Sequence, residues 1–268
     1  MLKSLLLHAS AETVDPGSGP ALYALGLARD FGAHLKAPVF ELNVTSKQET
    51  DDLPSGASDV SSQKAAALRT AADDAGVQIS VETERQMSFG VPDWLCDLGK
   101  LHDLTIAGVD GGGIISERQL AECLVFRSGR PVLLVPRNHA KSFEASRVIV
   151  AWDYSAPAAR ALAEALPFLR RATDITIATV GDDKDFMTSL EPGEVIEAMQ
   201  RRGVRAEHRE ITRGSGRIGD VLQGFAADSG ADLLVMGAFG HSRMRDFILG
   251  GATRGILEQL RLPTLLSH

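Results

Sequence analysis

The sequence predicts an α/β fold in which two parallel-sheet domains follow one another along the chain. Short apolar segments of strand length alternate with longer segments of helical length, a pattern typical of a parallel sheet covered by helices. The segment 233–236 is an unbroken apolar run, which indicates a strand buried on both faces. The same order of segments occurs twice in the 268 residues, so each half has the length of an ordinary domain.

In the first half, apolar strands alternate with helical segments from the start of the chain. The segment 77–82 alternates between apolar and polar residues, as a half-buried strand does. The expected strands are 2–8, 38–44, 77–82, 104–107 and one within 130–136, and the expected helices are 20–35, 61–75, 91–101 and 117–127.

The second half repeats this order of elements. Its third strand, 204–211, alternates in polarity, which indicates a half-exposed strand at the edge of the sheet. The expected strands are 148–152, 175–180, 204–211, 233–236 and 262–266, and the expected helices are 158–171, 193–202, 218–229 and one that opens at 250–253 and ends at 261–263.

The two halves can be aligned, which indicates an internal duplication. The segment 103–108 aligns with 232–237, and Gly111 then falls on Gly240. A polar segment without apolar periodicity, 137–145, separates the halves. We therefore predict domains at 1–137 and 146–268, each with a five-stranded sheet.

Composition and charge exclude several classes of protein. A formal net charge of -7 argues against general binding to nucleic acid or to an acidic membrane, both of which need a basic surface. No apolar run has the length of a membrane span, and residues 1–8 are too short for the apolar core of a signal peptide, so we expect a cytoplasmic protein. Cys96 and Cys123 lie outside any C-x-x-C or metal-ligand pattern, and we expect both to be buried free thiols.

The segment after strand 233–236 is the best candidate for a ligand site. Gly237 and Gly240 follow the strand, and Gly250 opens the next helix. Glycine allows backbone N–H groups to approach a ligand closely. A helix start adds unpaired N–H groups and the positive end of the helix dipole, both of which favour an anion such as phosphate.

The spacing Gly237-x2-Gly240-x9-Gly250 resembles the motif G-x2-G-x9-G-[ST] of the ATP-binding branch of the universal stress proteins. The sequence departs from that motif at Gly251, where the family has Ser or Thr, whereas Thr253 matches a threonine of the pattern that touches phosphate. The order of elements is also similar to the tandem form of this family over essentially the whole chain. The resemblance implies two doubly wound, Rossmann-like domains that pack as an internal pseudo-dimer.

The resemblance also implies which residues bind a nucleotide. Asp153, at the end of strand 148–152, falls on an aspartate that contacts adenosine, and Val180 falls where backbone groups contact the base. From the sequence alone, Asp153 serves equally well as a cap for the following turn. The full candidate set is Asp153, Val180, Met236, Gly237, Gly240, Gly250, Gly251 and Thr253.

The expected ligand is ATP, or ADP or AMP, with or without Mg²⁺. The first half has His8-Ala9-Ser10 where Asp153 would repeat, so we expect its site to be degenerate. The expected partners are an adenine nucleotide and the internal pseudo-dimer, with further homodimerisation left open. We expect the protein to bind neither nucleic acid nor membranes.

A second glycine motif lies at 214–219. Gly214, Gly216 and Gly219 fit G-x-G-x-x-G, but they follow the predicted edge strand rather than the central strand of a dinucleotide-binding unit. No P-loop, G-x-S-x-G or zinc-protease motif is present, and we expect no catalytic or metal-binding residues. Three functions remain: a stress-response regulator that binds nucleotide, a scaffold that binds none, and a slow ATPase.

Overall fold

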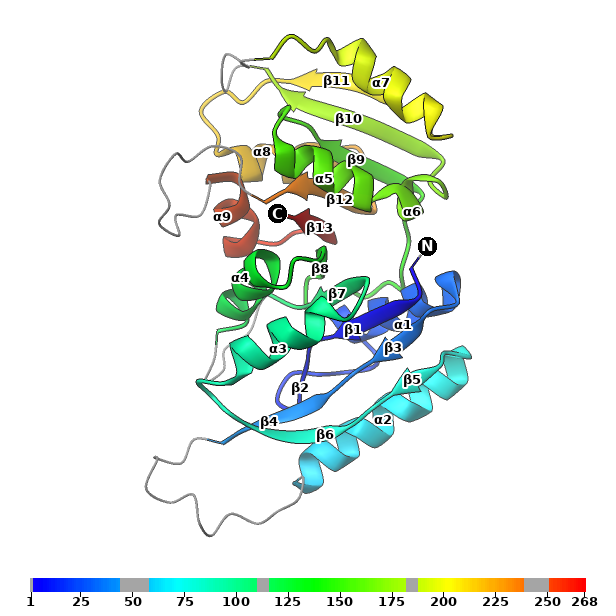
Figure 1. Cartoon of the computed structure of the whole chain (residues 1–268), viewed down its shortest axis with the longest axis vertical. Helices are drawn as coiled ribbons and strands as arrows, with labels where there is room; N and C mark the ends of the chain where they lie inside the picture. The colour runs from blue at the N-terminus through cyan, green and yellow to red at the C-terminus, as the bar shows by residue number, and fades with distance from the viewer. Residues whose placement is uncertain (1, 44–57, 110–115, 182–187, 239–250) are drawn as a thin grey trace. The chain divides into compact units, whose positions relative to one another are not determined.

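The computed structural model divides the chain into two compact units, Met1–Phe143 and Glu144–His268 (Figure 1). The structure describes residues 2–43, 58–109, 116–181, 188–238 and 251–268. The division lies inside the polar segment 137–145. In the described part of the chain, no helix combines the length and the apolar character needed to cross a membrane.

The second unit contains a parallel sheet that is wound in both directions from its first strand. The strands are β9 (Arg147–Ala151), β10 (Asp174–Val180), β11 (Glu207–Ile211), β12 (Leu233–Gly237) and β13 (Thr264–Ser267). Their order across the sheet is β11-β10-β9-β12-β13, and every pairing between neighbours is parallel (Figure 1). The chain therefore reverses its direction of winding between β9 and β12.

The helices of the second unit connect these strands. They are α5 (Ala156–Glu164), α6 (Leu166–Leu169), α7 (Pro192–Arg201), α8 (Ile218–Asp228) and α9 (Gly251–Glu258). The single helix expected at 158–171 is divided at Ala165, and Pro167 is the second residue of α6. A proline lacks the N–H that would continue the α-helical hydrogen bonds, which accounts for the division.

The first unit has the same winding with longer, interrupted strands. Its strands are β1 (Ser4–Leu7), β2 (Ala9–Ser10), β3 (His34–Lys36), β4 (Val39–Asn43), β5 (Ile79–Ser80), β6 (Thr83–Met87), β7 (Leu104–Ala107) and β8 (Val132–Leu134). The order β8-β7-β1-β3-β5 corresponds to that of the second unit, and a smaller parallel sheet, β2-β4-β6, extends it. The helices are α1 (Gly19–Phe31), α2 (Asp59–Ala75), α3 (Val91–Lys100) and α4 (Glu117–Arg127).

Three expectations for the first unit were wrong. The helix expected at 20–35 ends at Phe31, because Gly32 adopts φ 58° and caps the helix, and the residues that follow form β3. The strand expected at 77–82 continues as β6, which pairs with β4 over residues 83–87. Cys123 is only half-buried, although Cys96 is buried as expected.

An aspartate before the fourth strand of each winding makes the same contacts in both units. Asp103 accepts hydrogen bonds from the amides of Lys3 and Ser4 at 2.7 and 3.0 Å. Asp232 accepts from the amides of Ser146 and Arg147 at 3.1 and 2.8 Å. In each unit this carboxylate ties the fourth strand to the start of the first, so the sequence alignment of the halves corresponds to matching structure.

Candidate functional site

The carboxyl ends of β9 and β12 define the candidate site of the second unit. In a doubly wound sheet, loops diverge where the winding reverses, and this leaves a crevice at the carboxyl ends of the two strands. Val148 and Val150 of β9 pair in parallel with Leu233 and Val235 of β12. Asp153, Val180, Met236 and Gly237 all lie at the carboxyl ends of β9, β10 and β12, so the sheet brings these predicted residues to one edge.

Asp153 caps the chain as it turns from β9 into α5. Its Oδ1 accepts a hydrogen bond from the amide of Ser155 at 3.0 Å. Ser155 is the N-cap residue of α5, and its Oγ accepts from the amide of Ala158 at 3.2 Å. The Asp153 side chain is half-exposed, and a carboxylate has acceptor sites beyond the one used here. The capping role and a contact with a ligand are therefore compatible.

Two aromatic residues flank Asp153, and sequence reasoning missed them. The rings of Trp152 and Tyr154 meet edge to face with centroids 5.8 Å apart. Trp152 is 8% exposed, and its Nε1 has no hydrogen-bond partner among the described residues. The Trp-Asp-Tyr triplet directly after a buried strand was the available signal.

Tyr154 also holds a strained backbone conformation. Its φ is 59°, and it is the one non-glycine residue with positive φ in the described part of the chain. A bulky side chain in this region costs about 1–3 kcal/mol and is often found at functional sites. Burial, and then the charges of Glu191 and Glu210, raise the pKa of the Tyr154 hydroxyl above its usual value.

An acidic side chain lies beside the carboxyl end of β10. Val180 is 7% exposed, so its side chain belongs to the core and only its backbone is available to a ligand. The Glu210 side chain fills the space beside Gly181 where a Cβ would otherwise lie. The amide of Gly181 donates to Ile211 O at 3.1 Å. This side of the crevice is negatively charged and has no free amide at Gly181.

Gly237 is required by the packing of α5. A Cβ on Gly237 would lie 2.5 Å from Ala158 N and 2.9 Å from Pro157 Cβ. The next amide, that of Ala238, donates to Ser267 O at 2.6 Å. The start of α5 therefore gives Gly237 a packing reason to be glycine that the sequence did not show, and its contact with a ligand stays a prediction.

The remaining predicted residues lie in or before α9. Gly251 is the first residue of this helix, and Thr253, in its first turn, is 1% exposed. Three glycines of the sequence prediction, Gly111, Gly240 and Gly250, lie outside the described residues.

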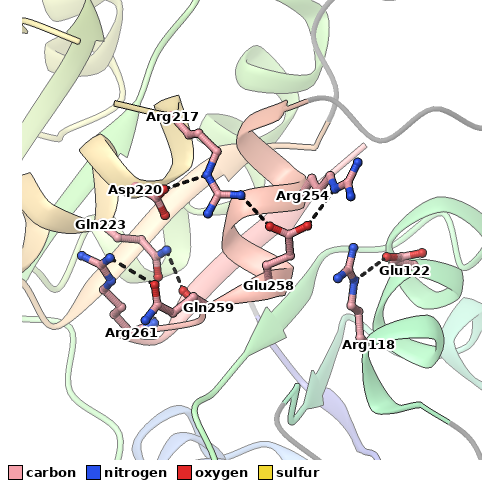
Figure 2. Close-up of polar contacts among 9 residues, drawn as sticks. All are labelled: Arg118, Glu122, Arg217, Asp220, Gln223, Arg254, Glu258, Gln259 and Arg261. Atoms are coloured by element: carbon pink, nitrogen blue, oxygen red, sulfur yellow. Dashed lines mark hydrogen bonds and ion pairs between the residues drawn. The ribbon is translucent and has the colours of Figure 1, made fainter. Parts of the chain in front are cut away.

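An ionic cluster fastens α9 to the start of α8 (Figure 2). Arg217 donates through Nε to Asp220 at 2.9 Å and through Nη1 to Glu258 at 2.6 Å. Arg254 donates through Nε to the other carboxylate oxygen of Glu258 at 2.7 Å. Glu258 is thus held by two guanidinium groups, which lower the pKa of its carboxyl, with the Arg254 hydrogen bond the larger cause.

The third glycine of the G-x-G-x-x-G segment also serves the contact between α8 and α9. A Cβ on Gly219 would lie 2.5 Å from Ala252 O and 3.3 Å from Gly255 Cα. Gln223, fully buried in α8, donates to Gln259 O and accepts from the amide of Arg261, both at 2.8 Å (Figure 2). The segment follows β11, which stands at the end of the strand order, so Gly219 serves a helix contact beside an edge strand.

Among the described residues, side chains of the first unit occupy the corresponding edge of its sheet. Arg137 forms an ion pair with Glu117, which is 4% exposed, and donates to Thr13 O at 2.6 Å. Thr13 Oγ1 donates to Glu117 at 3.2 Å. A cavity of about 20 Å³, enough for a water molecule, remains beside His8 among the described residues.

His8 is buried next to this ion pair. Burial, and then the charge of Arg137, lower the pKa of His8 to about 4. Its Nε2 has no partner among the described residues, and its ring lies tilted against that of Phe40, with centroids 5.4 Å apart. The imidazole is therefore neutral at physiological pH.

Comparison with known proteins identifies the second unit. Residues 144–268 match the model of the universal stress protein family. Universal stress protein Slr1230 from Synechocystis sp. is 27% identical over 143 residues, which are 51% of this chain and 46% of that protein. The chain thus aligns with less than half of the length of this relative.

The fold of the whole chain has a solved counterpart. The crystal structure of a universal stress protein from Archaeoglobus fulgidus DSM 4304 matches with a TM-score of 0.67 at 15% identity, covering 98% of this chain and 97% of that chain. Identity at this level shows the shared fold alone. Residues 144–268 of this chain therefore belong to the universal stress protein family, within a two-unit α/β fold that a universal stress protein of Archaeoglobus shares over almost its whole length.

Proposed function

We propose that the second unit binds ATP or a related adenine nucleotide at the carboxyl ends of β9 and β12, and that occupancy regulates a role of the chain in the stress response. The observation that carries the proposal is the position of Asp153. Its carboxylate is half-exposed at the point where the winding reverses and lies between two aromatic residues. An acceptor at this point fits the amino group of adenine or a ribose hydroxyl.

The charges of the described residues favour one orientation of the nucleotide. Glu191 and Glu210 make the side of the crevice near Tyr154 negative. Phosphate would be repelled there, whereas the N–H and O–H donors of adenine and ribose would not. The adenosine therefore lies toward β10 and the phosphates toward β12 and α9.

The phosphate contacts of this proposal rest on the start of α9. The described amides beside the strands, those of Gly181 and Ala238, donate within the chain. The first amides of an α-helix have no partner inside the helix, and α9 begins at Gly251. We propose that these amides and those of Gly240 and Gly250 hold the phosphates, with Mg²⁺ bound through the nucleotide.

A scaffold that binds no nucleotide is the competing function. It is favoured by the engagement of the described amides and by the burial of Thr253, which is 1% exposed. The substitution of Gly251 for the Ser or Thr of the motif points the same way. In this case, the two units would act through their surfaces alone.

Gently purified full-length protein distinguishes the two functions. We expect denaturation to release a bound adenine nucleotide that mass spectrometry detects. We also expect ATP, ADP and AMP added to the native protein to replace this bound nucleotide. We include cAMP as a competitor because one universal stress protein has been solved in complex with it. Release of no nucleotide, together with no uptake of added ATP, would support the scaffold.

A glycine substitution tests the location of the site. Gly240→Leu places a bulky side chain where the phosphates are proposed to bind, and we expect it to abolish nucleotide uptake while leaving the fold intact. Gly224→Ala is the matched control, since Gly224 lies in α8 with open space around it. Uptake that survives Gly240→Leu would remove the glycine segment from the site.

A slow ATPase is the third function. It would be supported by release of phosphate from ATP above the background rate, provided that Asp153→Ala abolishes this release.

A further inference from the structure

A buried carboxylate lies at the start of α4 in the first unit, and Arg137 holds it. Glu117 is the first residue of α4 and is 4% exposed. The Arg137 guanidinium donates through Nε to Glu117 Oε2 at 2.7 Å and forms an ion pair with Oε1. The Thr13 hydroxyl also donates to Oε1, at 3.2 Å. This two-point contact between an arginine and an oxyanion is the geometry in which arginine also binds phosphate.

The second unit has no carboxylate at the corresponding position. In each unit the fourth strand of the winding, β7 or β12, is followed by a helix that leads to the last strand, and these helices begin at Glu117 and at Gly251. An anion near the start of a helix is stabilised by the helix dipole. In the first unit, a side chain of the protein itself supplies that anion.

The residues that hold Glu117 also border a small cavity. Arg137 and Thr13 line this cavity of about 20 Å³ together with His8 and Ser18. His8 is 5% exposed, and its Nε2 has no hydrogen-bond partner among the described residues. Ser18 is the N-cap residue of α1, but its side chain makes no capping hydrogen bond. An unpartnered imidazole nitrogen and an uncapped helix start therefore border the same space as the guanidinium, which points to a polar ligand.

The charges around the cavity balance only because Glu117 is present. Asp15 lines the cavity, and Lys64 donates to the carbonyl oxygen of Val14, another lining residue, at 2.9 Å. Arg137 and Lys64 thus contribute two positive charges, and Asp15 and Glu117 contribute two negative ones. His8 is neutral at physiological pH because burial lowers its pKa to about 4. Without the Glu117 carboxylate, the described groups at this place would carry a net positive charge and would attract an anion.

We propose that Glu117 is a built-in anion, whose carboxylate occupies an oxyanion site of the first unit and keeps phosphate groups out of it. The site consists of the Arg137 guanidinium, the Thr13 hydroxyl and the start of α4. An inorganic oxyanion such as phosphate takes the place of the carboxylate when the Glu117 side chain is removed. Because the carboxylate is tethered to the site, it outcompetes free phosphate in the natural chain. The proposal concerns the first unit and does not depend on nucleotide binding by the second.

The ring signals of His8 in NMR spectra report on this site and not on the second unit. We expect inorganic phosphate, exchanged for chloride at constant ionic strength, to shift the His8 signals of full-length Glu117→Ala with half-saturation at about 1 mM. His8→Gln assigns these signals among the seven histidines. The natural chain should show no saturable shift of His8. A saturable shift in the natural chain, or none in Glu117→Ala, would overturn the proposal.

Glu122→Ala is the matched control. Glu122 lies in the same helix and accepts from Arg118 Nε at 3.1 Å, so this variant also removes a carboxylate from an arginine (Figure 2). Neither Glu122 nor Arg118 lines the cavity, and phosphate should leave the His8 signals of this variant unchanged. An equal shift in Glu122→Ala would reduce the effect to general charge. Arg137→Gln added to Glu117→Ala should abolish the shift, and its survival would remove Arg137 from the site.

A second variant and a second readout apply if Glu117→Ala unfolds. This variant leaves the mostly buried Arg137 without the carboxylate, so a chain that is unfolded in chloride should regain its circular dichroism spectrum in phosphate. Glu117→Gln keeps the side-chain volume and an oxygen that accepts from Arg137 Nε, so it should fold and still exclude phosphate. A phosphate-dependent shift of His8 in Glu117→Gln, or a Glu117→Ala chain that stays unfolded in both salts, would contradict the role of Glu117 as an internal anion.

Discussion

At the scale of single residues, Asp153 has two functions that substitution can separate. Asp153→Asn keeps an oxygen that accepts from the Ser155 amide, so we expect the free energy of unfolding to change little. Asp153→Ala removes that acceptor and should lower the free energy of unfolding by about 1 kcal/mol. Denaturant unfolding of the two variants measures the difference.

Nucleotide affinity gives the second part of this comparison. Both Asp153 variants lose the carboxylate charge, so both should bind ATP about tenfold more weakly, which corresponds to about 1.4 kcal/mol. An Asn variant with normal stability and weakened binding would assign Asp153 to the ligand. Normal affinity in both variants would leave Asp153 as a cap alone.

His8 predicts a pH dependence of stability. Its pKa in the folded chain is about 4, below the ordinary value of 6.5, so between these pH values the unfolded chain binds a proton that the folded chain does not. The free energy of unfolding therefore falls as the pH drops below 6.5, with His8 accounting for about 2 kcal/mol at about pH 5. His8→Gln should remove this part of the pH dependence in urea unfolding, and an unchanged dependence would contradict the assignment.

At the scale of secondary-structure elements, two glycines of α8 predict opposite effects. Gly219→Ala places a Cβ 2.5 Å from Ala252 O, so α8 and α9 must separate, and the free energy of unfolding should fall by about 1–3 kcal/mol. Gly224→Ala meets nothing within 4 Å and should raise it by about 0.5–1 kcal/mol, because alanine favours a helix. Thermal unfolding of both variants provides the check, and equal effects would show that the helix contact is not close.

The elements show how far a sequence determines structure. The order of strands and helices could be predicted because buried strands such as 233–236 are continuous apolar runs. The end of α1 could not be predicted, because the segment 33–35 continues the apolar pattern of the helix. Only the positive φ of Gly32 ends the helix before this segment. The sequence of β6 is polar, so no apolar pattern predicts a strand there. It forms a strand by pairing with β4.

The candidate site shows a similar limit. Asp153, Val180 and Met236 were placed correctly at one edge of the sheet because their position follows from strand order. The physical reason for Gly237 was not available, since it depends on how closely α5 approaches β12.

At the scale of the whole molecule, the duplication predicts matched effects in the two units. Asp103→Ala and Asp232→Ala each remove an acceptor of two amides at the start of the first strand in their own unit. Each should lower the free energy of unfolding of its unit by about 1–2 kcal/mol. Amide hydrogen exchange should become faster at residues 3–4 in Asp103→Ala and at residues 146–147 in Asp232→Ala. Faster exchange in the other unit would contradict the claim that the two aspartates have matching roles.

The two units of the chain also differ in what their crevices contain. The ion pair of Arg137 and Glu117 fills the first, whereas Asp153 is half-exposed in the second. The packing of two units as an internal pseudo-dimer remains a prediction from the family resemblance. The difference between the crevices predicts that the chain binds nucleotide in one unit only.

Isothermal titration with ATP of the full-length protein, after removal of any nucleotide that purifies with it, tests this central claim most directly. We expect saturable heat with a stoichiometry of one nucleotide per chain, weakened about tenfold by Asp153→Asn. No heat up to about 1 mM ATP, or two nucleotides per chain, would contradict the account.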